Sequence, residues 1–281
     1  MNSLGEAENK GGLAPVGPAP ISLSTGDLTA YAEMEPVSAC ATYKAADRFL
    51  QDLNSVPSTA LEKVKKAVSA PRMKRYLDLA GGDLRLAVRL HTWNAAVAGS
   101  LLPTLHIAEV TIRNVAMRRL VGKYGKHWYR NTDLLNHRLG QSGLAQNLND
   151  AYENEVARQR RGNLSDYITS ELTFGFWVNI FTRKFHPHLW KPELHTIVAG
   201  FPRDKNITDL HEGVEFVRSF RNNVAHHKDL ICKPVPENYE RTLEVIGMLC
   251  VNTRNAAERT SAFHRVWACA PVPHNLLQGQ A

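Results

Sequence analysis

Cysteine is scarce and widely spaced in this sequence. The four cysteines, Cys40, Cys232, Cys250 and Cys269, form no C-x-x-C pair within the 281 residues. Zinc ribbons and disulfide-rich scaffolds depend on closely spaced or numerous cysteines, so the sequence argues against both classes. We therefore expect reduced thiols and a cytoplasmic protein.

Several patterns that mark common enzyme and membrane classes are also missing. There is no Gly-rich phosphate loop, no G-x-S-x-G motif and no H-E-x-x-H motif. No apolar run approaches the length of a membrane span, and the N-terminus lacks the basic-then-apolar pattern of a signal peptide. We therefore expect neither a cofactor nor a contact with a membrane.

Alternating strand patterns are absent, whereas helical periodicity runs through most of the chain. The strongest apolar stripe recurs every three or four residues, at Leu86, Leu90, Trp93, Val97 and Leu101. Pro103 is expected to end this helix, with another helix running from Leu105 to about Val121. Helices of this length joined by short loops favour an all-α fold, an up-and-down helical bundle.

The chain is expected to hold one folded domain, because 281 residues of which 43% are hydrophobic can bury one sizeable core. Residues 1–40 are rich in Gly, Pro, Ala and Ser, which is typical of a disordered leader. The helical domain is then expected to cover residues 41–270, and residues 271–281 are expected to form a flexible tail.

Local signals predict the boundaries of the other helices. Thr59–Glu62 has the form of a capping box, and Asp83 follows a pair of glycines and is expected to cap the long helix. The polar segment 130–142 is expected to be a loop, whereas 144–161 is expected to form a charged helix. A further helix is expected to start at Ser165–Asp166 and to continue through Ile180.

The balance of charge permits an acidic partner. Lysine and arginine number 34 against 27 acidic residues, which gives a net charge of +7 and a pI near 9.3. Nucleic acid is the default partner for such a chain. Many helical proteins are equally basic without binding an anion, so the charge alone does not decide the function.

The densest cluster of polar and titratable groups is the segment Ser219–His227, with the sequence S-F-R-N-N-V-A-H-H. Thr208 is expected to cap the helix that this segment closes. At about 100° per residue, Asn222 and His226 stack one turn apart, with Arg218 beside them on the side away from the apolar stripe. Arg221 lies near the edge of that stripe, and its long side chain can reach around the helix.

These residue types suit cleavage of an RNA phosphodiester by its own 2′-hydroxyl group. His226 can take the hydroxyl proton or protonate the leaving oxygen, and Arg221 can hold the phosphorane oxygens. Asn222 can orient the phosphate or the imidazole, and Arg218 and His227 are expected to bind substrate. This chemistry requires no metal.

A purely structural interpretation of the same residues stays open. Arg221 can pair with Glu215 or with a neighbouring helix, and His226 and His227 can simply occupy a helix end, where the helix dipole favours imidazolium. On the helix expected after Pro103, Glu109 can likewise pair with Arg113 four residues on. Alternatively, Glu109 or Asn114 orients the catalytic groups from a neighbouring helix.

Two groups of residues contain side chains of the types that bind metal ions. The first contains His186, His188 and His195, and the second contains His226, His227 and Cys232. Neither spacing fits a zinc signature, and prolines interrupt the first group. We therefore expect no metal site.

The segment 221–227 resembles the Arg-polar-x-x-x-His signature of the HEPN superfamily, and more narrowly the Arg-Asn-x-x-Ala-His-His form of Abi-like (abortive infection) proteins of bacteria. Two further stretches, 93–114 and 171–177, resemble the same family in the same order. The resemblance spans about Arg72 to Ile231. It implies a HEPN-like helical domain with Arg221, Asn222 and His226 as catalytic residues.

The resemblance also implies a function and partners. It implies a metal-independent endoribonuclease acting in bacterial phage defence or as a toxin, with RNA as substrate and an antitoxin or another defence-system component as partner. The alternative is a HEPN-like module that binds RNA, a nucleotide or a protein and cleaves nothing. A homodimer is expected in either case, because the polar face of Arg218, Asn222 and His226 gives one monomer only half of an RNA groove.

Overall fold

The computed structural model describes residues 52–140, 143–159, 161–191, 194–198, 200–274 and 277. Every regular element among these residues is a helix, which confirms the predicted all-α class. The chain divides into two units, 1–44 and 45–281, and all described residues belong to the second unit. The expected leader, residues 1–40, lies outside the described residues.

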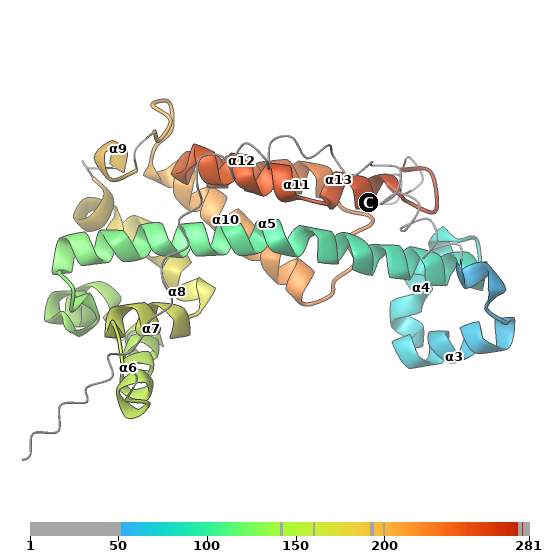
Figure 1. Cartoon of the computed structure of the whole chain (residues 1–281), viewed down its shortest axis with the longest axis horizontal. Helices are drawn as coiled ribbons and strands as arrows, with labels where there is room; N and C mark the ends of the chain where they lie inside the picture. The colour runs from blue at the N-terminus through green and yellow to red at the C-terminus, as the bar shows by residue number, and fades with distance from the viewer. Residues whose placement is uncertain are drawn as a thin grey trace, which may run out of the picture. The chain divides into compact units, whose positions relative to one another are not determined.

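The fold is organised around one helix, α5 (Leu84–Tyr124), which is 41 residues long (Figure 1). Asp83 caps this helix as expected, since its carboxylate accepts two hydrogen bonds from backbone N–H groups of the first turn. The expected break at Pro103 is wrong, because the helix continues through it. Leu101 and Leu105 are each 1% exposed, and burial of such side chains on both sides offsets the roughly 3 kcal/mol that an internal proline costs.

Four of the described helices from the C-terminal part of the chain pack along α5, namely α10 (Ile207–Ala225), α11 (Val235–Leu249), α12 (Val251–Thr260) and α13 (Phe263–Ala268). The loop after α10 meets the first part of α5, where the Leu230 N–H donates to Asn94 Oδ1 at 2.8 Å. The end of α13 reaches the same region, where Trp93 Nε1 donates to the Val266 carbonyl at 2.9 Å. The helices α10 and α13 therefore end close to where α5 begins.

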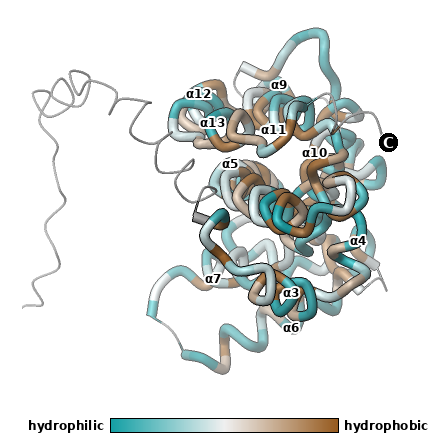
Figure 2. Tube along the Cα trace, turned by 90° about the vertical axis from the view of Figure 1, so that its right-hand side faces the viewer, coloured by the Kyte–Doolittle hydropathy of each residue, from teal (hydrophilic) through white to brown (hydrophobic). Residues whose placement is uncertain are grey.

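Within residues 52–83, which the structure describes, three short helices precede α5, namely η1 (Asp52–Ser55), α3 (Ser58–Val68) and α4 (Ala70–Leu79). The expected capping box at Thr59–Glu62 does not form, because α3 already begins at Ser58 and Pro57 occupies the capping position. Glu62 instead pairs with Lys65, with Oε2 3.5 Å from Nζ. Figure 2, which looks nearly along α5, places α4 and α10 on the same side of that helix.

The far end of α5 is covered by short helices: η2 (Trp128–Arg130), η3 (Asp133–Leu139), α6 (Gly143–Ala157), α7 (Leu164–Glu171), α8 (Phe174–Asn179), η4 (Arg183–Phe185), η5 (His186–Trp190) and α9 (Leu194–Ile197). The expected loop at 130–142 is wrong, since η3 is a π-helical turn that buries Leu134 and Leu139. The helix expected from Ser165 is divided, because Thr173 caps a new helix and accepts the Phe176 N–H at 3.4 Å.

The continuous helix α5 also corrects the expectation that no apolar run approaches the length of a membrane span. By length and composition alone, α5 is the one helix among the described residues that could cross a membrane. Part of its apolar surface, including Leu90, Val97 and Ile112, is buried against the surrounding helices, whereas Leu102 is 49% exposed. The core helix of a globular protein has these same properties.

The described residues of the expected tail pack against the helical domain. Leu277 is 1% exposed, and Val272 packs against the same core. His274 Nε2 lies 3.0 Å from the Trp267 carbonyl, and its ring lies 5.2 Å from the Trp267 ring. These residues are thus held by specific contacts to α13 and the core.

Candidate functional site

The helix α10 carries the motif, and its two ends are defined by hydrogen bonds. Asn206, rather than the expected Thr208, is the N-cap: its side chain accepts the Thr208 N–H at 2.7 Å, and Asp209 accepts the Asn206 N–H at 2.7 Å. This reciprocal pair is a capping box that the sequence analysis missed. The motif does close the helix as expected, because α10 ends at Ala225.

The helix ends in a Schellman motif centred on His227. The Lys228 N–H donates to the Asn223 carbonyl at 3.0 Å, and the His227 N–H donates to the Val224 carbonyl at 3.1 Å. His227 has a φ of +54°, which is the left-handed conformation that this position requires and that glycine adopts most easily. A histidine here costs about 1 kcal/mol of conformational energy relative to glycine.

Arg221 is fixed between two helices. Its Nε lies 3.0 Å from Glu109 Oε2 on α5, and its Nη1 donates to Asn222 Oδ1 at 3.3 Å. Of the two interpretations of Glu109, the contact across helices is therefore the observed one, rather than a pair with Arg113. The remaining N–H groups of the guanidinium have no partner within the described residues, and they are available to an anion.

Arg218 is oriented differently from Arg221. Its Nε donates to Glu215 Oε2 at 2.9 Å, and its Nη2 makes a second, short hydrogen bond to Oε1 of the same carboxylate. This hydrogen-bonded carboxylate raises the pKa of the Arg218 guanidinium. Glu215 was a possible partner of Arg221, but the structure pairs it with Arg218.

Both histidines at the end of α10 are exposed. The His226 backbone N–H donates to the Asn222 carbonyl at 2.9 Å, whereas its imidazole has no hydrogen bond or ion pair within the described part of the chain. The structure thus joins Arg221 to Asn222 but makes no direct side-chain contact between either residue and His226. His227 lines a pocket of about 470 Å³ together with Val224 and Ala225.

That pocket contains residues that the sequence analysis did not select. Arg72 and Tyr76 reach it from α4, and His91 and Asn94 reach it from α5. Asn94 belongs to one of the stretches that carry the family resemblance, but nothing in the sequence indicated that α4 lies beside it. A pocket between helices distant in sequence depends on their packing, which periodicity cannot reveal.

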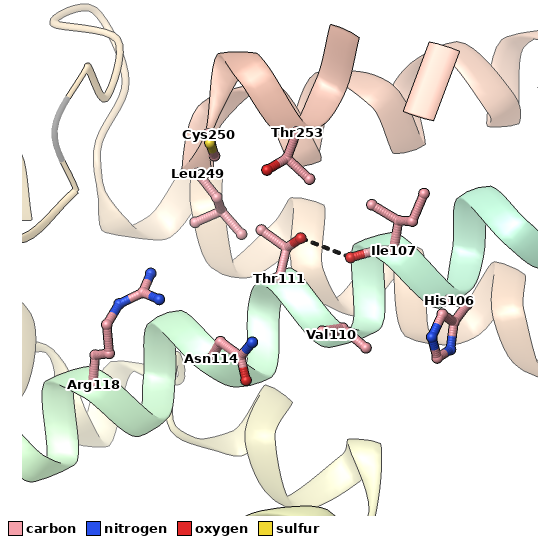
Figure 3. A pocket seen from close by; sticks show the side chains of 9 residues that line it. All are labelled: His106, Ile107, Val110, Thr111, Asn114, Arg118, Leu249, Cys250 and Thr253. Carbon is pink, nitrogen blue, oxygen red and sulfur yellow. Dashed lines mark hydrogen bonds between the residues drawn. The ribbon is translucent and has the colours of Figure 1, made fainter. Parts of the chain in front are cut away.

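Asn114 does not approach the motif. It lines a different pocket of about 420 Å³ between α5 and the junction of α11 and α12 (Figure 3). Cys250 and Thr253 lie across from Thr111 there, and Thr111 Oγ1 donates to the Ile107 carbonyl at 2.7 Å. Hydrogen bonds from Thr253 lower the pKa of the Cys250 thiol. Within the described residues, Asn114 makes no hydrogen bond to Arg221 or His226, whereas Glu109 contacts Arg221 directly.

The described residues hold no group of three or more His, Cys, Asp or Glu side chains that could bind a metal ion. The first histidine group has other contacts. His186 Nε2 donates to the Phe181 carbonyl at 2.8 Å, His188 Nε2 lies 2.6 Å from Arg138 Nη1, and the His195 ring lies 5.5 Å from the Phe201 ring. These imidazoles therefore contribute to the packing of the domain.

No family model, curated protein or solved structure matches this chain. The interpretation of the site therefore depends on its residues and their geometry, together with the sequence resemblance described above.

Proposed function

We propose that this protein is a metal-independent endoribonuclease of HEPN type, related to Abi-like proteins, with RNA as its substrate. The observation that carries the proposal is Arg221, held by Glu109 at 3.0 Å and by Asn222 at 3.3 Å, on the helix whose end exposes His226. A guanidinium fixed in this way loses little conformational entropy when it binds a phosphate. The exposed imidazole of His226 follows on the same helix end, and histidine is the side chain most often used for general acid–base catalysis.

The proposed reaction is an internal transesterification. His226 removes the proton from the 2′-hydroxyl group, whose oxygen then forms a bond to phosphorus while the bond from phosphorus to the 5′-oxygen breaks. The imidazolium returns the proton to the leaving 5′-oxygen. The products are a 2′,3′-cyclic phosphate and a 5′-hydroxyl group, and Arg221 stabilises the charge on the phosphorane oxygens. Asn222 positions the guanidinium or the phosphate.

Arg218 and His227 serve as substrate-binding residues in this proposal. Arg218 is 36% exposed, so it can reach a phosphate only by sharing or leaving its bond to Glu215. His227 faces the pocket at the end of α10. Arg218 is therefore expected to contribute less to RNA binding than an unpaired arginine at the same position.

We further propose a homodimer in which the two α10 helices face each other. The outer face of α10 carries Arg218, Asn222 and His226, while Val214 and Val217 on the opposite face are buried. A two-fold axis would place the same cations on both walls of a groove. Light scattering at micromolar concentration is expected to give twice the 31.4 kDa chain mass, and a monomer with full activity would contradict the dimer.

The biological setting proposed from the resemblance is bacterial phage defence or toxin action in the cytoplasm, with an antitoxin or another defence-system partner. Expression of the chain in bacteria without that partner is expected to arrest growth. His226→Ala should relieve the arrest, and equal toxicity of both forms would contradict this role.

A non-catalytic RNA- or protein-binding module is the second candidate, and the Glu109 contact favours it. A carboxylate at 3.0 Å neutralises part of the charge that Arg221 would offer to a phosphorane. The deciding experiment is incubation of the purified chain with mixed RNAs in EDTA, followed by analysis of the product ends. Cyclic phosphate ends that disappear in His226→Ala support the nuclease, whereas RNA binding without cleavage supports the module.

A further inference from the structure

The pocket beside the end of α10 is formed by three helices and one loop residue. α4 contributes Arg72 and Tyr76, α5 contributes the wall from His91 to Leu102, and the end of α10 continues into His227. Its volume of about 470 Å³ lies within the range of ordinary small-molecule sites. The pocket therefore ends at His227, the residue that follows the histidine used in the proposed reaction.

One wall of this pocket is flat and apolar. Ala95, Ala98 and Gly99 lie three and four residues apart on α5 and line the pocket together, so no long side chain projects from this surface. A Cβ atom built at Gly99 would meet nothing within 4 Å. A planar ring can therefore lie against the helix, with the exposed Leu102 at its edge.

Asn94 is one of the polar residues that line the pocket. This side chain is 7% exposed, its Oδ1 accepts the Leu230 N–H at 2.8 Å, and its amide nitrogen has no partner within the described residues. This amide nitrogen can donate to a ligand or to a water molecule. Asn94 therefore offers a donor to whatever occupies the pocket.

His91 and Tyr76 form the end of the pocket near Asn94. Their rings meet edge to face, with centroids 5.2 Å apart. Burial first, and then the charge of Arg72, lowers the pKa of His91, so its imidazole is neutral near pH 7. A neutral imidazole presents one donor and one acceptor. Arg72 is exposed and has no ion-pair partner among the described residues, so its charge is available to an anion.

We propose that this pocket binds one nucleobase of the RNA substrate, with the attached phosphate near Arg72 and His227. The inference rests on the proposed function and extends it, because it places base recognition beside His226. An apolar wall suits one face of a base, while an amide donor and a neutral imidazole suit the hydrogen-bonding edge of a base. The exposed cation suits the phosphate.

The test uses the whole chain and four ribonucleoside monophosphates as probes in titration calorimetry. Gly99→Leu fills the pocket, whereas Gly122→Leu adds the same side chain to the same helix outside the pocket, where a Cβ atom also meets nothing within 4 Å. Leucine favours a helix more than glycine does, so both variants should melt at or above the wild-type temperature. Gly99→Leu should weaken binding of the best nucleotide at least about tenfold, and Gly122→Leu should leave it unchanged.

The outcomes separate this inference from the nuclease proposal. Failure of all four nucleotides to bind, or equal affinity in wild type and a folded Gly99→Leu variant, overturns the pocket assignment even if the chain cleaves RNA. Nucleotide binding that only Gly99→Leu abolishes supports the pocket, even if the chain cleaves nothing. If the wild-type chain cleaves RNA with a preference for one base, and Gly99→Leu loses that preference, both proposals are supported.

Discussion

Two regions that each contain a pair of closely spaced histidines, η5 and the end of α10, differ in what their imidazoles contact. In η5, His186 is 6% exposed and bonded to the Phe181 carbonyl at 2.8 Å, and His188 lies against Arg138. At the end of α10, His226 and His227 are exposed, and His227 holds a left-handed backbone conformation. The first region uses its histidines for packing, whereas the second keeps them accessible at a cost in stability. Strain of this kind often marks functional positions.

The largest expected effect is a loss of RNA cleavage that occurs when a side chain at the end of α10 is removed but not when a histidine of η5 is removed. Arg221→Ala and His226→Ala should each lower RNA cleavage at least about a hundredfold, because one transition-state contact is typically worth a few kcal/mol. His188→Ala removes an imidazole from the other region and should retain nearly full activity. Initial rates with a labelled RNA in EDTA measure all three variants, with circular dichroism to verify folding.

Activity that survives in His226→Ala would assign acid–base chemistry to another group. Equal losses of RNA cleavage in His188→Ala and His226→Ala would show that both substitutions act by destabilising the fold rather than by removing a catalytic group.

The next effect concerns the two arginine–glutamate pairs of α10. Glu109→Gln removes the charge that holds Arg221 and should lower kcat about tenfold, since a neutral acceptor orients a guanidinium less strongly than a carboxylate does. Glu215→Gln weakens the bond that Arg218 must leave to reach a phosphate, so this variant should mainly lower KM. Steady-state kinetics separate the two effects, and identical profiles for both variants would contradict the positioning role of Glu109.

A smaller effect tests the conformation of His227. His227→Gly should raise the free energy of unfolding by about 1 kcal/mol, because glycine adopts positive φ without steric cost. The same variant should weaken nucleotide binding, since it removes a side chain from the pocket. Urea denaturation measures the stability, and His227→Ala is the matched control that loses the imidazole but keeps the strain. Equal stability of the two variants would refute the strain.

The smallest effect is the pH dependence of stability due to His186. Burial lowers the pKa of His186 in spite of its bond to Phe181, and Arg183, Lys191 and His211 act in the same direction as burial. The folded state therefore binds fewer protons than the unfolded state below the ordinary histidine pKa of about 6.5. The contribution of neutral His186 to the free energy of unfolding should be fully present above this pH and should decrease as the pH falls below it.

Melting temperatures measured between about pH 7 and pH 5 give the slope of stability against pH. His186→Gln, which can still donate to the Phe181 carbonyl, should make the slope shallower, while His226→Gln should leave it nearly unchanged because His226 is exposed. A steeper slope in His186→Gln would show that another group controls the acid sensitivity.

Helical periodicity and local end signals were sufficient for the all-α class, for Asp83 as a cap and for the end of the motif helix near Ala225. These features depend on contacts within a few residues, which the order of the amino acids contains directly. The nature of the motif residues, an arginine and a histidine on one exposed helix end, is equally a property of the sequence.

Tertiary packing determined three features that local sequence signals did not predict: the continuity of α5, the partner of Glu109 and the pocket beside α10. Burial on both sides of Pro103 kept α5 continuous, although proline by itself predicts a break. The partner of Glu109 is Arg221, 112 residues further along the chain, rather than Arg113 on its own helix. The pocket of Arg72, His91 and Asn94 exists only because α4, α5 and α10 pack together. Such contacts depend on the distance between helices in space, which no periodicity along the chain specifies.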